Sequence, residues 1–467
     1  MNKHYHFIGI GGIGMGALAA LSLDKGYRVS GSDLRSNQVT ERLKARGAEI
    51  FSGHAGKNIG EADCVIFSSA IRADNPELTE ARRKQTPIVQ RAKFLVELME
   101  GHIGITVAGA HGKTTTTSMV AHLLETAGLQ PTTAIGGIVN GTHSYAELGE
   151  GKYFVTEVDE SDGSFLYFSP DYSIITNIDF EHVDYYQNWQ NILDAYREFI
   201  GKTRSGGTIL ACGDDELLSN LLNESGCTVR TYGFADTNDV SAANIKFDGF
   251  DTTFTCVADG KNLGPFSLKV PGRHNVVNAL ACIALGLSLS IDPDVIRASL
   301  QGYLGVQRRF QLKANADDIW VVDDYAHHPT EIKATLETAQ LFKQSVSGGE
   351  ANSLITVFQP HRYSRLQGLM NDFVESLINS DHLIVTDIYA ASEPPIEGIT
   401  AEKLCEQIRA LTDGQVSYVP KEKIVDYLMD IVKPRDLVLT LGAGDITHIA
   451  DDLAEAVKKR SAVAEVS

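Results

Sequence analysis

The sequence predicts three α/β domains built on mostly parallel sheets, of which the first and the last are Rossmann-like. Short apolar runs alternate with helix-like stretches along the whole chain, as they do in parallel α/β domains. Two of those runs end in glycine-rich loops that open helices. The chain of 467 residues is also too long for a single hydrophobic core. We therefore expect domains at residues 1–100, 101–305 and 306–467.

Net charge excludes several classes of partner. Asp and Glu number 60 against 41 Lys and Arg, which gives a formal net charge of −19. Because DNA, RNA and anionic lipid bind to net basic faces, we expect no nucleic acid partner and no membrane insertion. An anionic small molecule must then be held by local features, such as backbone amides, a few basic side chains or a metal ion.

Cysteine usage and the N-terminus indicate a cytoplasmic protein. The six cysteines include no CxxC pair, which fits reduced buried thiols better than disulfides or a zinc site. The apolar stretch Phe7–Leu23 contains five glycines within eight residues and is followed by no cleavage-like site, so it differs from a signal peptide. No run reaches the roughly 20 unbroken apolar residues of a membrane span.

The first glycine loop follows the apolar run Tyr5–Ile10. It has the GxGxxG pattern, in which glycines permit a tight turn and let the backbone approach a diphosphate at the start of a helix. A second strand, Arg28–Ser30, leads to an acidic residue about 20 positions after the loop, where such folds often hold a ribose hydroxyl. The candidate binding residues are Gly9, Gly11, Gly12, Ile13, Gly14 and Asp33.

Two alternatives stay open for this loop. It is either a closely packed strand–helix turn without a ligand or a diphosphate site, and its strand–turn–helix context favours the second. The diphosphate belongs either to NAD or to a UDP-sugar, and the loop does not distinguish them.

The second glycine loop follows the run Ile103–Ala108 and precedes the helix-like run Thr116–Ala127. Its sequence is a short GxxGKT variant of the Walker pattern. The lysine of this pattern neutralises phosphate charge, and the following threonine hydroxyls can reach a magnesium ion. A GKTTTT run at a strand–helix junction therefore predicts a P-loop-type ATPase domain. The candidate phosphate-binding residues are Gly109, Ala110, His111, Gly112, Lys113, Thr114 and Thr115.

Two further predicted strands of the central domain, at residues 153–158 and 172–178, end in polar residues that include Glu157, Asn177 and His182. Because ligands sit at the carboxyl ends of parallel strands, these loops are expected to converge with the second glycine loop. One carboxylate and one hydroxyl suffice for a first magnesium ion. His182 is a less usual magnesium ligand, and a hydrogen-bonded loop histidine is an equal alternative.

Polar residues also follow the predicted strands of the third domain. Residues 320–323 lead to DDYAHHP, and residues 354–358 lead to QPHRYSR. Side chains gathered at strand ends indicate a site. Arg362 and Arg365 are three residues apart, so on a helical turn they share a face and can fork a carboxylate. Taken alone, each arginine is explained equally well as an ordinary surface residue.

These motifs resemble the Mur ligases of bacterial peptidoglycan synthesis. The resemblance extends from His6 to about Ala450, and long matches in the right order make it specific. The first and the last two motifs point to the alanine-adding member of the family. The matching segments are HFIGIGGIGM, AGAHGKTTTT, TEVDESDGSFL, TNIDFEHVD, PGRHNVVNA, GVQRRF, DDYAHHPTE and FQPHRYSR.

The resemblance implies a UDP-sugar domain, a central ATPase and a C-terminal domain for the amino acid. The implied substrates are UDP-N-acetylmuramate, L-alanine and ATP with Mg²⁺. The implied reaction activates the sugar carboxylate as an acyl phosphate, which the amine of alanine then attacks to form an amide.

The resemblance also implies roles for particular residues. Those that resemble the catalytic group are Lys113, His182, Arg362 and Arg365. Those that resemble the magnesium ligands are Thr114, Glu157 and His182. Those that resemble the surroundings of ATP are Asn177, His274, Asn275, Arg309 and Asp324. Those that resemble the amino-acid site are Tyr325, His327, His361, Arg362 and Arg365.

Two departures and three rival hypotheses qualify this expectation. Ala110 stands where the family usually has Thr, and Glu181 where many relatives have Asp. An NAD-dependent oxidoreductase would explain the first loop alone, and a non-enzymatic nucleotide switch only the second. A relative that adds a preformed peptide to the same UDP-sugar stays open, although the first motif favours alanine.

Overall fold

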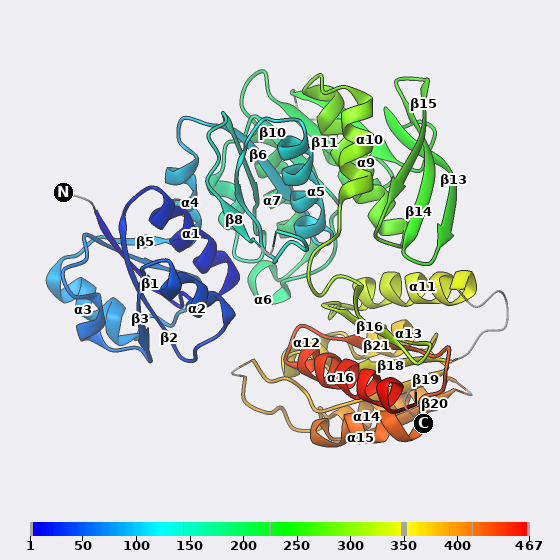
Figure 1. The fold of residues 1–467 in the computed structure, drawn as a ribbon. Coiled ribbons are helices and arrows are strands. Elements are labelled where there is room, and N and C mark those ends of the chain that lie inside the picture. Colours follow the sequence, from blue (N-terminus) through cyan, green and yellow to red (C-terminus); the bar gives the residue numbers. More distant parts are fainter. Residues whose placement is uncertain are drawn as a thin grey trace. The chain divides into compact units, whose positions relative to one another are not determined.

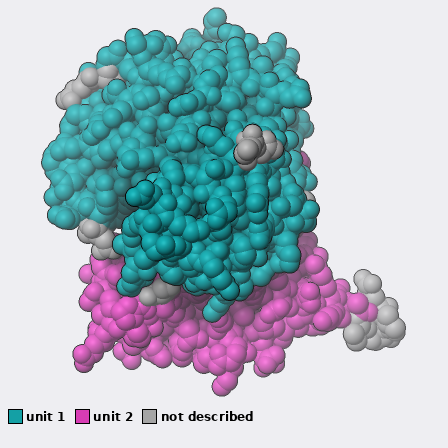
Figure 2. All heavy atoms as spheres, turned by 90° about the vertical axis from the view of Figure 1, so that its left-hand side faces the viewer, with its two compact units in different colours: residues 1–243, 255–266, 277–304 teal, residues 244–254, 267–276, 305–467 magenta. Residues whose placement is uncertain are grey.

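The computed structural model describes residues 3–142, 144–223, 226–346, 353–391, 393–412 and 414–464. Three sheets follow one another along the chain (Figure 1). The chain forms two compact units (Figure 2), and the first unit contains the first sheet and most of the second. The first unit comprises residues 1–243, 255–266 and 277–304, and the second comprises 244–254, 267–276 and 305–467. The predicted α/β class is confirmed, whereas the predicted domain boundaries stay predictions.

The first sheet has five parallel strands in the order β3-β2-β1-β4-β5. This order, with helices in the crossovers, is that of a doubly wound sheet. Its elements are β1 (His4–Ile8), α1 (Ile13–Asp24), β2 (Arg28–Asp33), α2 (Gln38–Ala45), β3 (Glu49–Ser52), η1 (Gly56–Ile59), β4 (Cys64–Phe67), α3 (Pro76–Lys84), β5 (Ile88–Gln90) and α4 (Arg91–Met99).

A buried carboxylate fastens α3 to the first sheet. Glu77 has 0% exposure and accepts hydrogen bonds from the Ser32 hydroxyl at 2.6 Å, the Asn58 amide at 2.7 Å and the Ala55 backbone N–H at 3.2 Å. The ring of His6 lies 3.4 Å away. Burial by itself raises the pKa of Glu77, but hydrogen bonds from His6, Ser32 and Asn58 outweigh it and lower this pKa below its ordinary value.

The second sheet has ten strands in the order β15-β14-β13-β12-β11-β10-β6-β9-β7-β8, and its central part is parallel. Its elements are β6 (Ile103–Ala108), α5 (Lys113–Thr126), β7 (Thr132–Ala134), β8 (Ala146–Glu147), β9 (Tyr153–Glu157), η2 (Ser164–Tyr167), β10 (Tyr172–Ile175), α6 (Val183–Tyr186), α7 (Trp189–Gly201), β11 (Thr208–Cys212), α8 (Glu216–Leu222), β12 (Thr228–Gly233), β13 (Val240–Asp248), β14 (Asp251–Ala258), β15 (Lys261–Leu268), α9 (Arg273–Ser288) and α10 (Pro293–Gly302).

The third sheet has the order β16-β17-β21-β18-β19-β20 and is parallel except for β16. Its elements are β16 (Gln311–Ala316), β17 (Ile319–Asp324), α11 (Pro329–Val346), β18 (Leu354–Phe358), α12 (Tyr363–Gly368), α13 (Met370–Leu377), β19 (His382–Val385), α14 (Ala401–Arg409), β20 (Gln415–Tyr418), η3 (Lys421–Lys423), α15 (Ile424–Ile431), β21 (Leu437–Leu441) and α16 (Ile446–Ala464).

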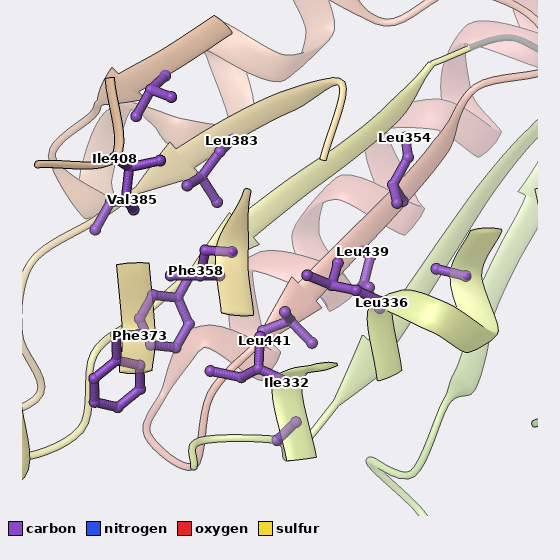
Figure 3. Close-up of a cluster of buried hydrophobic side chains, with 14 of the residues drawn as sticks. Ile332, Leu336, Leu354, Phe358, Phe373, Leu383, Val385, Ile408, Leu439 and Leu441 are labelled. Atoms are coloured by element: carbon purple, nitrogen blue, oxygen red, sulfur yellow. The ribbon is translucent and has the colours of Figure 1, made fainter. Parts of the chain in front are cut away.

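Helices cover both faces of the third sheet. Successive residues of a strand point to opposite faces, so Leu439 and Leu441 join a cluster with α11, α13 and α14, while Val438 joins a second cluster with α15 and α16. Figure 3 shows the first cluster, in which the rings of Phe358 and Phe373 lie 5.6 Å apart. The uniformly apolar strands are explained by burial on both faces.

The strand ends expected to carry functional residues agree with the structure to within three residues. The run Ile103–Ala108 is β6 without change, and the run at residues 172–178 is the shorter β10. Within the described part of the chain, no helix combines the length and the apolar character needed to cross a bilayer.

Candidate nucleotide and substrate sites

The second glycine loop connects β6 to α5 and requires glycine. Gly109 has a φ of +126° and Gly112 a φ of +82°, values that L side chains rarely adopt. A Cβ at Gly109 would also lie 2.1 Å from the hydroxyl oxygen of Thr176. Helix α5 begins at Lys113, so Lys113 and Thr114 lie in its first turn. Amide groups there have no intrahelical acceptor, which suits a phosphate.

Side chains at the end of β10 brace this loop. The side-chain oxygen of Asn177 accepts from the His111 backbone N–H at 2.9 Å, and its amide donates to the His111 carbonyl at 3.0 Å. The Thr176 hydroxyl donates to the same carbonyl at 2.6 Å. The ring of His111 lies 2.8 Å from the Asp179 carboxylate. Asn177, which was expected near ATP, therefore holds the loop that would contact the phosphates.

Thr114 and Glu157 lie together at the ends of α5 and β9. The Thr114 hydroxyl donates to the Glu157 carboxylate at 2.7 Å. Thr115, the alternative hydroxyl, is buried in the helix with 9% exposure. A Cβ at Gly136 would lie 1.5 Å from a Glu157 oxygen, so a side chain at position 136 would displace the Glu157 carboxylate from this position. The pair offers one hydroxyl and one carboxylate oxygen, the donor types that Mg²⁺ prefers.

His182 lies in an acidic cluster beside the loop. Its Nε2 is 3.4 Å from Glu160 and 3.5 Å from Glu181. Ligand atoms of Asp159, Glu160 and His182 all lie within 4.8 Å of one another. Burial by itself lowers the pKa of His182, but these three carboxylates outweigh it and raise this pKa. The φ of His182 is +56°, a strained value of the kind found at functional sites.

The first glycine loop lies between β1 and α1, with Gly12 at the N-cap of α1. Asp33 accepts a hydrogen bond from the Gly11 backbone N–H at 2.9 Å, and Asn37 donates to the Gly11 carbonyl at 2.9 Å. A Cβ at Gly11 would lie 2.8 Å from both side chains. Asp33 therefore braces the loop, and its contact with a ribose stays a prediction. The other loop residues are Gly9, Ile13 and Gly14.

Arg91 is a candidate that the sequence did not reveal. Its side chain is 28% exposed, and a guanidinium nitrogen lies 2.8 Å from the position of a Cβ on Gly14. The same guanidinium is 3.7 Å from Asp159. Arg91 thus places a cation between the first glycine loop and the acidic cluster. Arg91 is the first residue of α4, and no motif of the sequence analysis includes it.

Four residues expected near ATP belong to the second unit. Burial and the neighbouring Arg309 guanidinium lower the pKa of His274 to about 4, so its ring is neutral at pH 7. The Asn275 amide donates to the Pro271 carbonyl at 2.7 Å. Asp324 accepts from the backbone N–H of residue 310 at 2.6 Å and of residue 326 at 2.7 Å, and burial raises its pKa to about 6. Asn275 and Asp324 therefore brace the backbone.

Tyr325 packs against two guanidinium groups. Those of Arg308 and Arg309 lie 4.9 Å and 5.1 Å from the centre of its ring, which is within the range of a cation–π interaction. Arg308 also donates to the carbonyl oxygens of Gly442 at 2.5 Å and Gly444 at 3.1 Å. Arg308 was not among the sequence candidates, and it ties Tyr325 to the loop after β21.

Two histidines and an arginine gather beside Tyr325. The rings of His327 and His361 lie 5.6 Å apart, and Tyr389 stacks on His361 at 5.5 Å. Arg365 donates to Nδ1 of His361 at 3.3 Å. Arginine has no acceptor, so Nδ1 of His361 must be unprotonated. Burial and the cationic side chains around it lower the pKa of His361 to about 3, and the ring is neutral.

Arg362 differs from the expectation that it shares a helical turn with Arg365. It is the N-cap of α12 with a φ of +70°, and only Arg365 lies within the helix. The Arg362 backbone N–H donates to the Tyr389 carbonyl at 2.9 Å. Its side chain is exposed. The two arginines follow the same strand, but their spacing alone does not place both on one helical face.

The structure brings together two groups of candidates, one in each unit. The first group contains Lys113, Thr114, Glu157 and His182. The second contains Tyr325, His327, His361 and Arg365. The charge of Arg362 also contributes to lowering the pKa of His361. The residues expected around ATP are divided between the two units.

Three family models match the chain in succession. The Mur ligase family catalytic domain matches residues 4–103, the Mur ligase middle domain residues 107–286, and the Mur ligase glutamate ligase domain residues 308–444. The chain belongs to the Mur ligase family, whose members are ATP-dependent ligases.

Relatives with specific names match nearly the full length. A UDP-N-acetylmuramate–L-alanine ligase from Geotalea daltonii is 46% identical over 458 residues, which cover 98% of both chains. One from Trichlorobacter lovleyi is 46% identical over 96% of this chain and 98% of its own. The crystal structure of the UDP-N-acetylmuramate–alanine ligase from Thermotoga maritima is 31% identical, with a TM-score of 0.84 over 98% of this chain and 100% of its own. The oxidoreductase and nucleotide-switch hypotheses do not account for these matches.

Proposed function

We propose that this chain joins L-alanine to the carboxylate of UDP-N-acetylmuramate, with ATP converted to ADP and phosphate, in peptidoglycan precursor synthesis. The observation that carries the proposal is the full-length match to relatives of that name. The pairing of Thr114 with Glu157 beside the loop of Lys113 supplies the phosphate-handling site that this chemistry needs.

The reaction has two steps. A carboxylate oxygen of the sugar attacks the γ-phosphorus of ATP, which forms an acyl phosphate and releases ADP. The neutral amine of L-alanine then attacks the acyl carbon, so that an amide forms, phosphate leaves and the amine loses a proton. The first step brings an anion towards a polyanion, and the ammonium of Lys113 reduces this repulsion. Positioning of the two substrates accounts for most of the remaining acceleration.

Magnesium is the cation that the first group fits. Thr114 and Glu157 offer oxygen donors 2.7 Å apart, and His182 lies with Asp159 and Glu160 in a second cluster of donors. When bound, Mg²⁺ neutralises phosphate charge and orients the phosphates. The side chains of Asn177, Thr176 and Asp179 keep the loop in the shape that this arrangement requires.

The amino acid is proposed to bind in the second group. Arg362 and Arg365 supply positive charge for its carboxylate. Because His361 is neutral, its ring does not repel the arginines and contacts the amino acid without a charge of its own. The ring of Tyr325, packed on Arg308 and Arg309, is a rigid wall for a small side chain.

The UDP-sugar is proposed to bind in the first domain. The first turn of α1 presents amide groups to a diphosphate, and Arg91 adds a cation beside Gly14. We propose that residues 1–100, 101–305 and 306–467 serve the UDP-sugar, ATP and the amino acid respectively. We also propose a cytoplasmic location, since all three substrates of such a ligase are small cytoplasmic molecules.

Mass spectrometry of the product tests this function. The chain with UDP-N-acetylmuramate, L-alanine, ATP and Mg²⁺ is expected to yield UDP-N-acetylmuramoyl-L-alanine. Lys113→Ala is expected to abolish the product, while Glu150→Gln, at an exposed position of the same domain, is expected to leave it unchanged. Absence of the product from the unmodified enzyme would refute the proposal.

A further inference from the structure

The ammonium group of Lys113 is held by three acceptor groups. It donates to the Gly109 carbonyl at 2.5 Å, to the Ala110 carbonyl at 3.2 Å, and to both carboxylate oxygens of Glu160 at 2.8 Å. A lysine ammonium has three donors, so these groups match its capacity. A phosphate oxygen can bind Lys113 only if one of them gives way.

Glu160 is the strongest of these competitors because it alone is charged. Its side chain is 4% exposed, and its peptide is fixed in place. The Glu160 carbonyl accepts from the buried Tyr186 hydroxyl at 2.6 Å and from the Gly163 N–H at 3.0 Å. The carboxylate therefore cannot move into solvent as a surface side chain would.

A buried carboxylate that loses its cation carries a large cost unless another positive charge replaces it. His182 lies 3.4 Å from Glu160. The ligand atoms of Asp159, Glu160 and His182 lie within 4.8 Å of one another. A divalent cation shared by this cluster would compensate Glu160 at the moment when Lys113 turns to phosphate.

We propose that Glu160 is a positioning residue that makes tight phosphate binding at Lys113 conditional on a divalent cation. The inference rests on the proposed nucleotide site. Without a divalent cation, Glu160 stays paired with the ammonium of Lys113 and competes with nucleotide phosphate for it. With the cation, Glu160 is compensated and Lys113 is released to the phosphate. The enzyme thereby distinguishes magnesium nucleotide from free nucleotide before any chemistry takes place.

Equilibrium binding of ADP, measured by calorimetry in EDTA and in Mg²⁺, tests this role. Glu160→Gln keeps the shape and removes the charge. We expect it to bind ADP in EDTA about tenfold more tightly than the unmodified enzyme, a coupling of ordinary size. The gain in affinity on adding Mg²⁺ is expected to shrink by a similar factor. Glu150→Gln is the matched control and should behave as the unmodified enzyme.

The outcomes separate this inference from the proposed function. If the unmodified enzyme does not bind ADP in Mg²⁺, the nucleotide site itself is wrong. If the unmodified enzyme binds ADP in Mg²⁺, but Glu160→Gln binds ADP in EDTA no more tightly than the unmodified enzyme does, the role of Glu160 is overturned. Circular dichroism shows whether that variant folds. If Glu160→Gln does not fold, Glu160→Asp is measured instead, because the shorter aspartate side chain weakens the ion pair with Lys113. The role of Glu160 is then overturned if Glu160→Asp binds ADP in EDTA no more tightly than the unmodified enzyme.

Discussion

The guanidinium of Arg91 lies 3.7 Å from the carboxylate of Asp159, so the first turn of α4 is joined to the acidic loop after β9. The same side chain approaches Gly14 in the first glycine loop. One cation therefore adjoins both the expected diphosphate site and the cluster around His182. This contact connects the proposed site of the sugar nucleotide with the proposed site of phosphate chemistry within the first unit.

Arg91→Gln is predicted to raise the KM for UDP-N-acetylmuramate about tenfold, because a hydrogen bond to a charged group contributes about 1.5–3 kcal/mol. The KM for L-alanine should change little. Steady-state kinetics with each substrate varied in turn measures both values. Arg72→Gln serves as the control, since Arg72 is an exposed arginine of the same domain that pairs with Asp74. An unchanged KM for the sugar nucleotide would exclude Arg91 from its site.

Arg365→Lys is predicted to raise the KM for L-alanine about tenfold or more, since a lysine keeps the charge but loses the planar fork that fits a carboxylate. The substitution also removes the donor that fixes Nδ1 of His361. Arg435→Lys, at a half-exposed position of the same unit, is the matched control. If both variants gave the same KM for alanine, the second group would not be the amino-acid site.

Glu77→Gln is predicted to lower the stability at pH 7 by about 3 kcal/mol, because it breaks a buried charged network. The folded-state pKa of Glu77 is lowered, so its contribution is present above its ordinary pKa and is lost as the pH falls through the folded value. Urea unfolding of both proteins from pH 7 to pH 3 measures the difference. It should shrink towards acid, and a difference that stays constant with pH would contradict the ionic role.

Much of the fold was predictable because the apolar runs are short, buried on both faces and bounded by glycine or polar residues. The convergence of Thr114 and Glu157 was predictable for a topological reason, since parallel strands place their carboxyl ends at one edge. The role of Glu160 was not predictable. It lies among three acidic residues in a loop without periodicity, and Asp162 of the same loop instead accepts from the Ser164 N–H.

Other features depend on contacts distant in sequence. Arg91 lies close to Gly14 and Asp159, which are distant from it in the sequence, so no local sequence pattern indicates these contacts. Asp33 and Asn177 were expected to face ligands, yet their side chains hold the two glycine loops. A polar residue at a strand end can either bind a ligand or satisfy a loop peptide, and sequence alone does not separate these uses.

The measurement that tests the central claim most directly is phosphate release from ATP and Mg²⁺ with UDP-N-acetylmuramate, in the presence of L-alanine, of a tripeptide or of buffer. The account predicts release that requires both the UDP-sugar and L-alanine. Release with the tripeptide but not with alanine would contradict it and identify a peptide-adding ligase. Absence of release in every combination would contradict the ligase assignment as a whole.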